Sequence, residues 1–107
     1  MSAWGFLAMA IVFEILGTFF LKLSDGFAKW RWGVVAMGLY AGSFWSFAPA
    51  LRTIPVGVAY AIWAGCGVAA AVLIGLFAFG QRLGAGQMLF MLMIVAGAIG
   101  LRLSTAL

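Results

Sequence analysis

The sequence is poor in the residues that usually carry metal or redox chemistry. It contains no histidine and one cysteine, Cys66, which lies inside an apolar segment. A disulfide framework needs several cysteines, and a metal site needs several cysteine, histidine or carboxylate ligands, so both classes are excluded. We interpret Cys66 as a small packing residue, and we expect no metal, no cofactor and no enzyme activity.

Charge is equally scarce. Only 7% of the 107 residues are charged, and the six basic residues that give the net charge of +4 are scattered between apolar runs. Since they form no patch, nucleic-acid binding is not predicted. Apolar residues make up 67% of the chain and the mean hydropathy is +1.24. A soluble domain of this size could not bury so much apolar surface, so the natural solvent is lipid.

The N-terminus has no basic segment and no cleavage site of the kind that marks a signal peptide, and its apolar run contains an acid, Glu14. We therefore interpret this run as a retained helix.

The apolar residues fall into four runs, each of about the 17 to 25 residues that a helix needs to cross a bilayer. The predicted spans are residues 3–21, 32–51, 56–79 and 85–101. Their short connections favour antiparallel neighbours, so the predicted fold is an all-α membrane protein, a four-transmembrane-helix bundle in a single domain of residues 1–107. Pro55 suits the first turn of the third helix, and Pro49 is expected to bend the last turn of the second.

The orientation in the membrane is weakly specified. The first and third connections share one side and carry Lys22, Lys29, Arg31 and Arg82, whereas Arg52, Arg102 and the terminal amine lie on the other. This small excess of positive charge is a weak signal for the positive-inside rule, so both orientations are predicted.

Glu14 is the only charged residue inside a predicted span. Lys22 lies eight residues away, roughly 12 Å along a helix, which is too far to neutralise it. An ionised carboxylate at this depth costs several kcal/mol unless it meets water, a proton or a cation. The pattern therefore predicts a site for protons and cations, and the alternative is a neutral acid that hydrogen-bonds another helix.

The surroundings of Glu14 favour an organic cation. Residues within about 60° of it on a helical wheel are small or aliphatic with one hydroxyl, and we take them as the floor of a cavity: Leu7, Ala10, Ile11, Gly17, Thr18 and Leu21. The next helices offer further polar and aromatic side chains at helical spacing: Tyr40, Ser43, Phe44 and Phe47, then Tyr60 and Trp63. Aromatic faces beside a carboxylate suit lipophilic cations, although ordinary packing explains the same spacing.

Small residues let transmembrane helices approach closely, and this accounts for most of the fifteen glycines. Gly65 and Gly67 stand in the middle of the third span and predict a hinge, because they leave two turns of backbone uncovered. Trp4, Trp30 and Trp32 lie near span ends and are typical of an interfacial aromatic belt.

Several segments resemble the small multidrug resistance (SMR) family over essentially the whole chain. They are EILGT at residues 14–18, LKLSDGF at 21–27, YAGSFW at 40–45 and IPVGVAYAIWAGCG at 54–67. The first and last of these motifs are highly specific together. Within the family the chain is most similar to the EmrE-like quaternary ammonium and multidrug exporters.

The resemblance implies an antiparallel homodimer in the bacterial inner membrane that exchanges protons for cationic drugs. Glu14 matches the acid that binds proton and substrate in turn, and Tyr40, Tyr60 and Trp63 match its aromatic walls. Gly65 and Gly67 match the bend of the third helix. In the fourth helix Gly97 matches one residue of the dimer seam, but Phe90 replaces its glycine partner.

Three alternatives remain open. A guanidinium exporter of the same family carries a tryptophan one turn after the acid, whereas this chain has Gly17 at or beside that place. A rotor-ring proteolipid also has one mid-membrane glutamate, but usually in the second of two spans. A membrane assembly subunit without transport activity is the third. The favoured prediction is a proton-coupled antiporter for lipophilic or quaternary ammonium cations, with dual topology.

Overall fold

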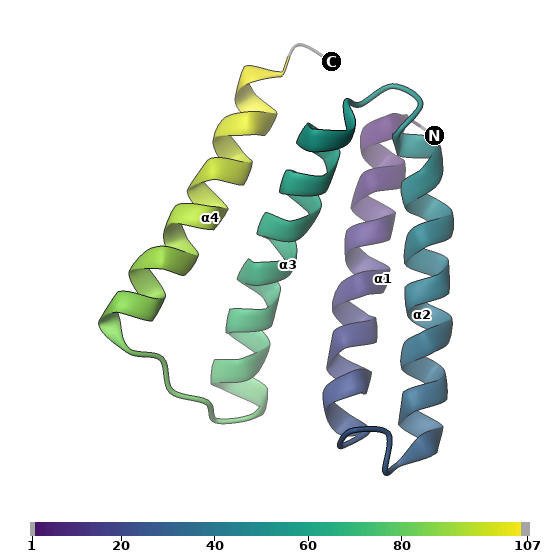
Figure 1. Cartoon of the computed structure of the whole chain (residues 1–107), viewed down its shortest axis with the longest axis vertical. Coiled ribbons are helices and arrows are strands. Elements are labelled where there is room, and N and C mark those ends of the chain that lie inside the picture. The colour runs from purple at the N-terminus through teal and green to yellow at the C-terminus, as the bar shows by residue number, and fades with distance from the viewer. Residues whose placement is uncertain (1, 106–107) are drawn as a thin grey trace. The chain divides into compact units, whose positions relative to one another are not determined.

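The computed structural model describes residues 2–105 as four α-helices joined by short loops (Figure 1). The helices are α1 (Ala3–Leu23), α2 (Trp30–Ala50), α3 (Val56–Ala78) and α4 (Ala85–Ser104). The predicted all-helical fold class is confirmed, and no strand occurs within residues 2–105. Residue 1 and residues 106–107 of the predicted domain lie outside the described range.

Three helices begin at the predicted residue, and the other helix ends differ from the predicted span ends by one to three residues. α1 continues through Lys22 to Leu23, and α4 continues through Arg102 to Ser104. The ends of an apolar run mark where the chain leaves the hydrocarbon core of the bilayer, whereas the last backbone hydrogen bond marks the end of a helix. A basic residue in the last turn interacts favourably with the helix dipole and extends its charge towards water, so it does not end the helix.

Among the residues described, three helices are long and apolar enough to cross a membrane, judged by length and composition alone: α1, α3 and α4. α2 has a similar length, 21 residues, but it is the least apolar of the four. Its sequence includes Arg31, Tyr40, Ser43 and Ser46, and these polar groups lower its hydropathy.

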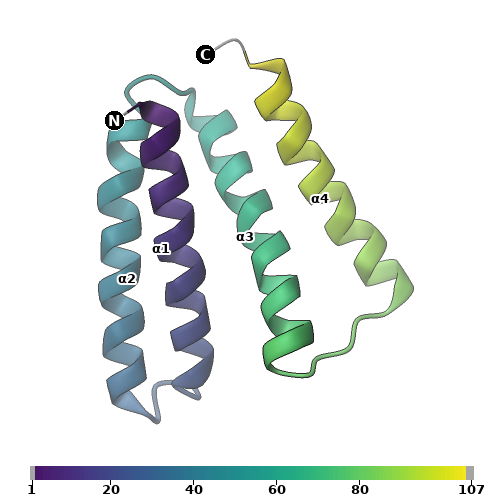
Figure 2. The ribbon, with the colours of Figure 1, turned by 180° about the vertical axis from the view of Figure 1, so that it is seen from behind.

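The chain divides between Ile54 and Pro55 into two compact units. Each unit is a helical hairpin, the first built from α1 and α2 and the second from α3 and α4 (Figure 2). The helices of the first hairpin contact each other more extensively than those of the second.

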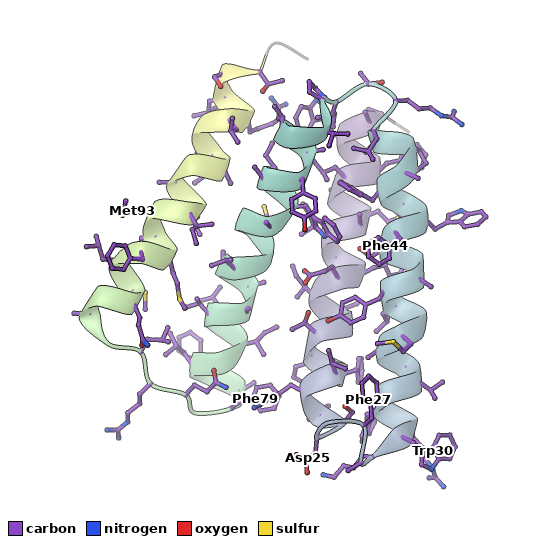
Figure 3. The ribbon with its side chains drawn as sticks, in the orientation of Figure 1. Asp25, Phe27, Trp30, Phe44, Phe79 and Met93 are labelled. Atoms are coloured by element: carbon purple, nitrogen blue, oxygen red, sulfur yellow. The ribbon has the colours of Figure 1, made fainter. Side chains whose placement is uncertain are left out.

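A tight loop closes the first hairpin. The Ser24 hydroxyl donates to the carbonyl of Leu21 at 2.6 Å and accepts from the amide of Phe27 at 3.2 Å. Asp25, Gly26 and Phe27 all have positive φ, at 51°, 65° and 68°. The ring of Phe27 lies so close to Gly33 that an added Cβ there would be 2.5 Å from it. Asp25 and Phe27 lie together at this end of the hairpin, where α2 begins at Trp30 (Figure 3).

The second hairpin has one close contact and several open grooves. A Cβ at Gly65 would collide with the Cβ of Ala98 in α4. Beside this contact, a groove of about 360 Å³ between α3 and α4 is lined by apolar residues, with Arg102 among the residues of its wall. α3 runs without interruption through Gly65 and Gly67. The hinge predicted at these residues stays a prediction, and Gly65 has a packing role as well.

Candidate functional site

Glu14 lies in the middle of α1, and its two carboxylate oxygens have different surroundings. Oε1 accepts a hydrogen bond from the Thr18 hydroxyl, one turn later, at 3.1 Å. Oε2 is buried and has no hydrogen-bond partner among the described residues. A buried acceptor without a partner is costly, so this oxygen has unused capacity to accept a hydrogen bond.

The Tyr40 hydroxyl connects α2 to this carboxylate. It lies 2.7 Å from Oγ1 of Thr18, and the distance alone permits either group to donate. A threonine hydroxyl has one proton, and Thr18 uses it towards Glu14. The phenol of Tyr40 is therefore the donor, and the hydrogen bonds run from Tyr40 through Thr18 to Oε1.

Gly17 allows this arrangement. A Cβ at Gly17 would be 3.1 Å from two atoms of the Tyr40 ring, a distance shorter than most real Cβ contacts, so the ring would have to shift. The sequence-based interpretation treats Gly17 as open floor for a wide cation. In the structure the tyrosine ring occupies the space beside this glycine, so the absence of a side chain at position 17 serves packing between α1 and α2.

Other predicted floor residues also lie in the contact between α1 and α2. The hydroxyl of Ser43, which is fully buried, donates to the carbonyl of Ala10 at 2.7 Å. Leu7 is 1% exposed and Ala10 is fully buried, whereas Ile11 is half-buried. Ser43 thus joins the two helices, and its single proton is not available to a ligand in this arrangement.

Phe44 lies on a different part of α2. It is 59% exposed and lines a surface groove together with Trp45 and Arg52. Its labelled side chain can be followed in Figure 3. Its predicted role in lining the cavity stays a prediction.

The two aromatic residues predicted on the third helix form a pair. The rings of Tyr60 and Trp63 are 5.6 Å apart between centroids and nearly perpendicular, at 85°. This edge-to-face geometry is a favourable one for aromatic rings. Tyr60 is 59% exposed, so its ring face remains accessible. That the pair faces Glu14 stays a prediction.

Gly97, the predicted seam residue, is exposed on α4, and a Cβ there would meet nothing within 4 Å. The hairpin itself therefore does not require glycine at this position. A seam with a second copy of the chain would explain it and stays a prediction.

The sequence predicts Thr18 on the floor of the cavity, but it does not predict that Thr18 bridges Glu14 and Tyr40. The spacing contained a usable signal, because residues four apart on a helix are neighbours and a hydroxyl at that position can reach a carboxylate. The phenol partner gave no such signal, since it depends on how α2 packs on α1.

Comparison with known proteins identifies the group to which the chain is related. The family model described as Small Multidrug Resistance protein matches residues 2–94. The chain belongs to the small multidrug resistance family. This confirms the family resemblance seen in the motifs at residues 14–18, 21–27, 40–45 and 54–67.

Curated relatives of this SMR protein match nearly its whole length. The spermidine export protein MdtI of Klebsiella pneumoniae (strain 342) is 39% identical over 103 residues, which cover 96% of this chain and 93% of the relative. The spermidine export protein MdtI of Escherichia coli O6:H1 is 38% identical with the same coverage. Membership of the family, with its apolar helices, makes this SMR protein a multi-pass transporter of the bacterial inner membrane.

Proposed function

We propose that this SMR protein is a proton-coupled antiporter in which Glu14 binds protons and organic cations in turn. The observation that carries the proposal is the buried, unpartnered Oε2 of a carboxylate in the middle of α1. A proton neutralises this group, and so does a cation, whereas an empty ionised site in the bilayer is costly.

Competition for one charge couples the two ligands. If proton and cation exclude each other at Glu14, each lowers the affinity of the protein for the other by the same factor. A proton that enters from outside then favours release of the cation there, and deprotonation inside permits the next cation to bind. No other acid in the described helices offers such a site, because Asp25 lies in the loop between α1 and α2.

The proposal includes an antiparallel homodimer, in which two copies with opposite orientation supply the inverted symmetry that larger transporters contain within one chain. The two Glu14 carboxylates then share one cavity near the middle of the membrane. Exchange of conformation between the two copies provides alternating access.

Antiparallel assembly requires that the chain insert in both orientations. We expect single-cysteine variants, made on a Cys66→Ala background, to be labelled from both sides of the membrane. Adding two lysines beside Arg52 is expected to shift the population one way, and adding two beside Lys29 to shift it the other way. A single orientation of the unmodified chain would contradict the antiparallel homodimer.

The first candidate substrate class is lipophilic and quaternary ammonium cations. The perpendicular pair of Tyr60 and Trp63 leaves the Tyr60 ring exposed, and an aromatic face attracts a cation that has no N–H group to donate. Guanidinium is expected to bind less tightly. The space at Gly17 contains the Tyr40 ring, and this chain lacks the tryptophan that guanidinium exporters carry there to hold a small planar ion.

The second candidate class is polyamines. The relatives described above are named as spermidine exporters and match 96% of this chain. The unpartnered Oε2 of Glu14 is also compatible with an ammonium group that donates N–H bonds.

Proton release from the purified protein distinguishes these candidates. We expect tetraphenylphosphonium and a quaternary ammonium cation to release protons at lower concentrations than guanidinium, because aromatic contacts favour broad apolar cations. Spermidine forms the third arm of the experiment. Release by spermidine alone would select the polyamine class, release by guanidinium alone would select the guanidinium exporters, and no release by any cation would refute the antiporter.

A further inference from the structure

We infer that the phenol of Tyr40 acts through Thr18 to hold one oxygen of Glu14, so that in each copy of the chain the other oxygen, Oε2, is the atom for which proton and cation compete. This inference rests on the proposed antiport function and adds how the carboxylate is set for it. Tyr40 then works as a positioning residue, in addition to any contact that its ring makes with a substrate.

The direction of the hydrogen bonds carries the first step. With Glu14 ionised, Oε1 accepts from Thr18 at 3.1 Å and Thr18 accepts from Tyr40 at 2.7 Å. Both O–H groups point towards the negative charge of Glu14, so the two hydrogen bonds follow one another in the same direction. Successive hydrogen bonds of this kind strengthen each other. These two hydrogen bonds therefore stabilise the ionised form of Glu14.

Packing holds the phenol in place. The ring of Tyr40 lies against the backbone of Gly17, where even a Cβ would be only 3.1 Å from it. Thr18 is the next residue of the same helix, so the contact that fixes the ring also sets the distance between the two hydroxyl groups. The hydrogen bonds from Tyr40 through Thr18 to Glu14, which we call the hydroxyl chain, thus depend on the contact between α1 and α2.

The two oxygens consequently have different tasks. A proton on Oε1 would weaken its hydrogen bond from Thr18, whereas Oε2 is buried and lacks any partner in the described chain. The proton is therefore expected on Oε2. A cation is also expected to contact Oε2, because Oε1 already accepts a hydrogen bond, and strict exchange follows from this shared atom.

Other charges of the first hairpin are remote from this group along the helices. Lys22, Asp25, Lys29 and Arg31 belong to the loop end of the hairpin, and Arg52 follows the opposite end of α2. Tyr40 is the titratable side chain of α2 that joins the hydrogen bonds of Glu14. The pH dependence of this site is therefore expected to respond to the hydroxyl chain.

The Tyr40→Phe variant tests the inference, because it keeps the ring beside Gly17 and removes only the hydroxyl. Loss of the donor weakens stabilisation of the ionised carboxylate, so the proton is held to higher pH. We expect the pH at which half of the cation binding is lost to rise by about half a unit or more. Affinity well above that pH should stay within about twofold of the unmodified protein, since the cation meets Oε2.

Variants of Thr18 provide the second measurement. Thr18→Val removes the hydrogen bond to Oε1 itself, so the midpoint should rise further, by about one to two units. Thr18→Ser restores a hydroxyl at the same place and should return the midpoint to that of the unmodified protein. Ser46→Ala is the matched control on α2, because its hydroxyl donates to the Gly42 carbonyl at 3.0 Å and belongs to a separate interaction. It should cause no shift.

The outcomes separate the inference from the proposed function. If Tyr40→Phe weakens cation binding equally at every pH without moving the midpoint, Tyr40 is only a wall of the site and the inference is wrong. An unchanged midpoint in Thr18→Val would also overturn it. If the unmodified protein binds cations independently of pH, the antiport proposal itself fails.

Discussion

Glu14→Gln is expected to abolish proton-coupled cation transport while leaving the four helices folded. The amide has nearly the same shape and retains an oxygen that can accept from Thr18, so the hydrogen bond observed at 3.1 Å can persist. It cannot bind a proton in the working range of pH and cannot balance a cation. Proton-driven efflux in reconstituted vesicles should fall to the level of empty vesicles, with unchanged helical content by circular dichroism.

The chain contains a matched control for this experiment. Asp25 is its only other acid and is exposed in the loop between α1 and α2 (Figure 3). Asp25→Asn should therefore retain transport. Efflux driven by a proton gradient in the Glu14→Gln variant would refute the central role of Glu14.

Gly65→Ala adds only one methyl group, but it is expected to destabilise the second hairpin strongly. The added Cβ would collide with that of Ala98, and neither atom can turn away, because both are attached directly to helix backbone. α3 and α4 must move apart, which typically costs about 1–3 kcal/mol of unfolding free energy. Denaturant titration in detergent, followed by helical content, measures this loss.

Gly57→Ala provides the control within the same helix. A Cβ at Gly57 would meet nothing within 4 Å, and alanine favours helix over glycine, so this variant should be as stable as the unmodified protein or slightly more stable. Equal stability of the Gly65→Ala and Gly57→Ala variants would contradict the close contact. If only a hinge required glycine at position 65, transport would slow without loss of stability.

The helical fold and the position of Glu14 in the middle of an apolar helix could be predicted because they depend on single-residue chemistry. Apolar runs of membrane-spanning length leave few alternatives to helices, and the lone acid among them stands out by its cost in lipid. Helix ends were less accurate, because Lys22 and Arg102 mark the edge of the apolar run and not the last hydrogen bond of the helix.

Packing between helices could not be predicted in the same way. A helical wheel places Gly17 beside Glu14, but it does not show that the ring of Tyr40 fills the adjacent space. It gives no reason to join Tyr40 and Thr18, whose hydroxyl oxygens are 2.7 Å apart. Gly65 shows the same limit, since its close neighbour Ala98 lies 33 residues later in the chain. Such contacts depend on the rotation and approach of two helices.

The contact between Gly17 and Tyr40 also restricts which substitutions this chain can accept. Because the tyrosine ring occupies the space beside position 17, Gly17→Trp alone places two aromatic rings in one volume. Room for the indole requires a smaller residue at position 40 as well, so the effects of the two substitutions are strongly non-additive. Introducing a tryptophan at position 17 of this chain therefore requires a change at position 40 as well. The order matters too: reducing Tyr40 first leaves a cavity, whereas enlarging Gly17 first separates α1 from α2.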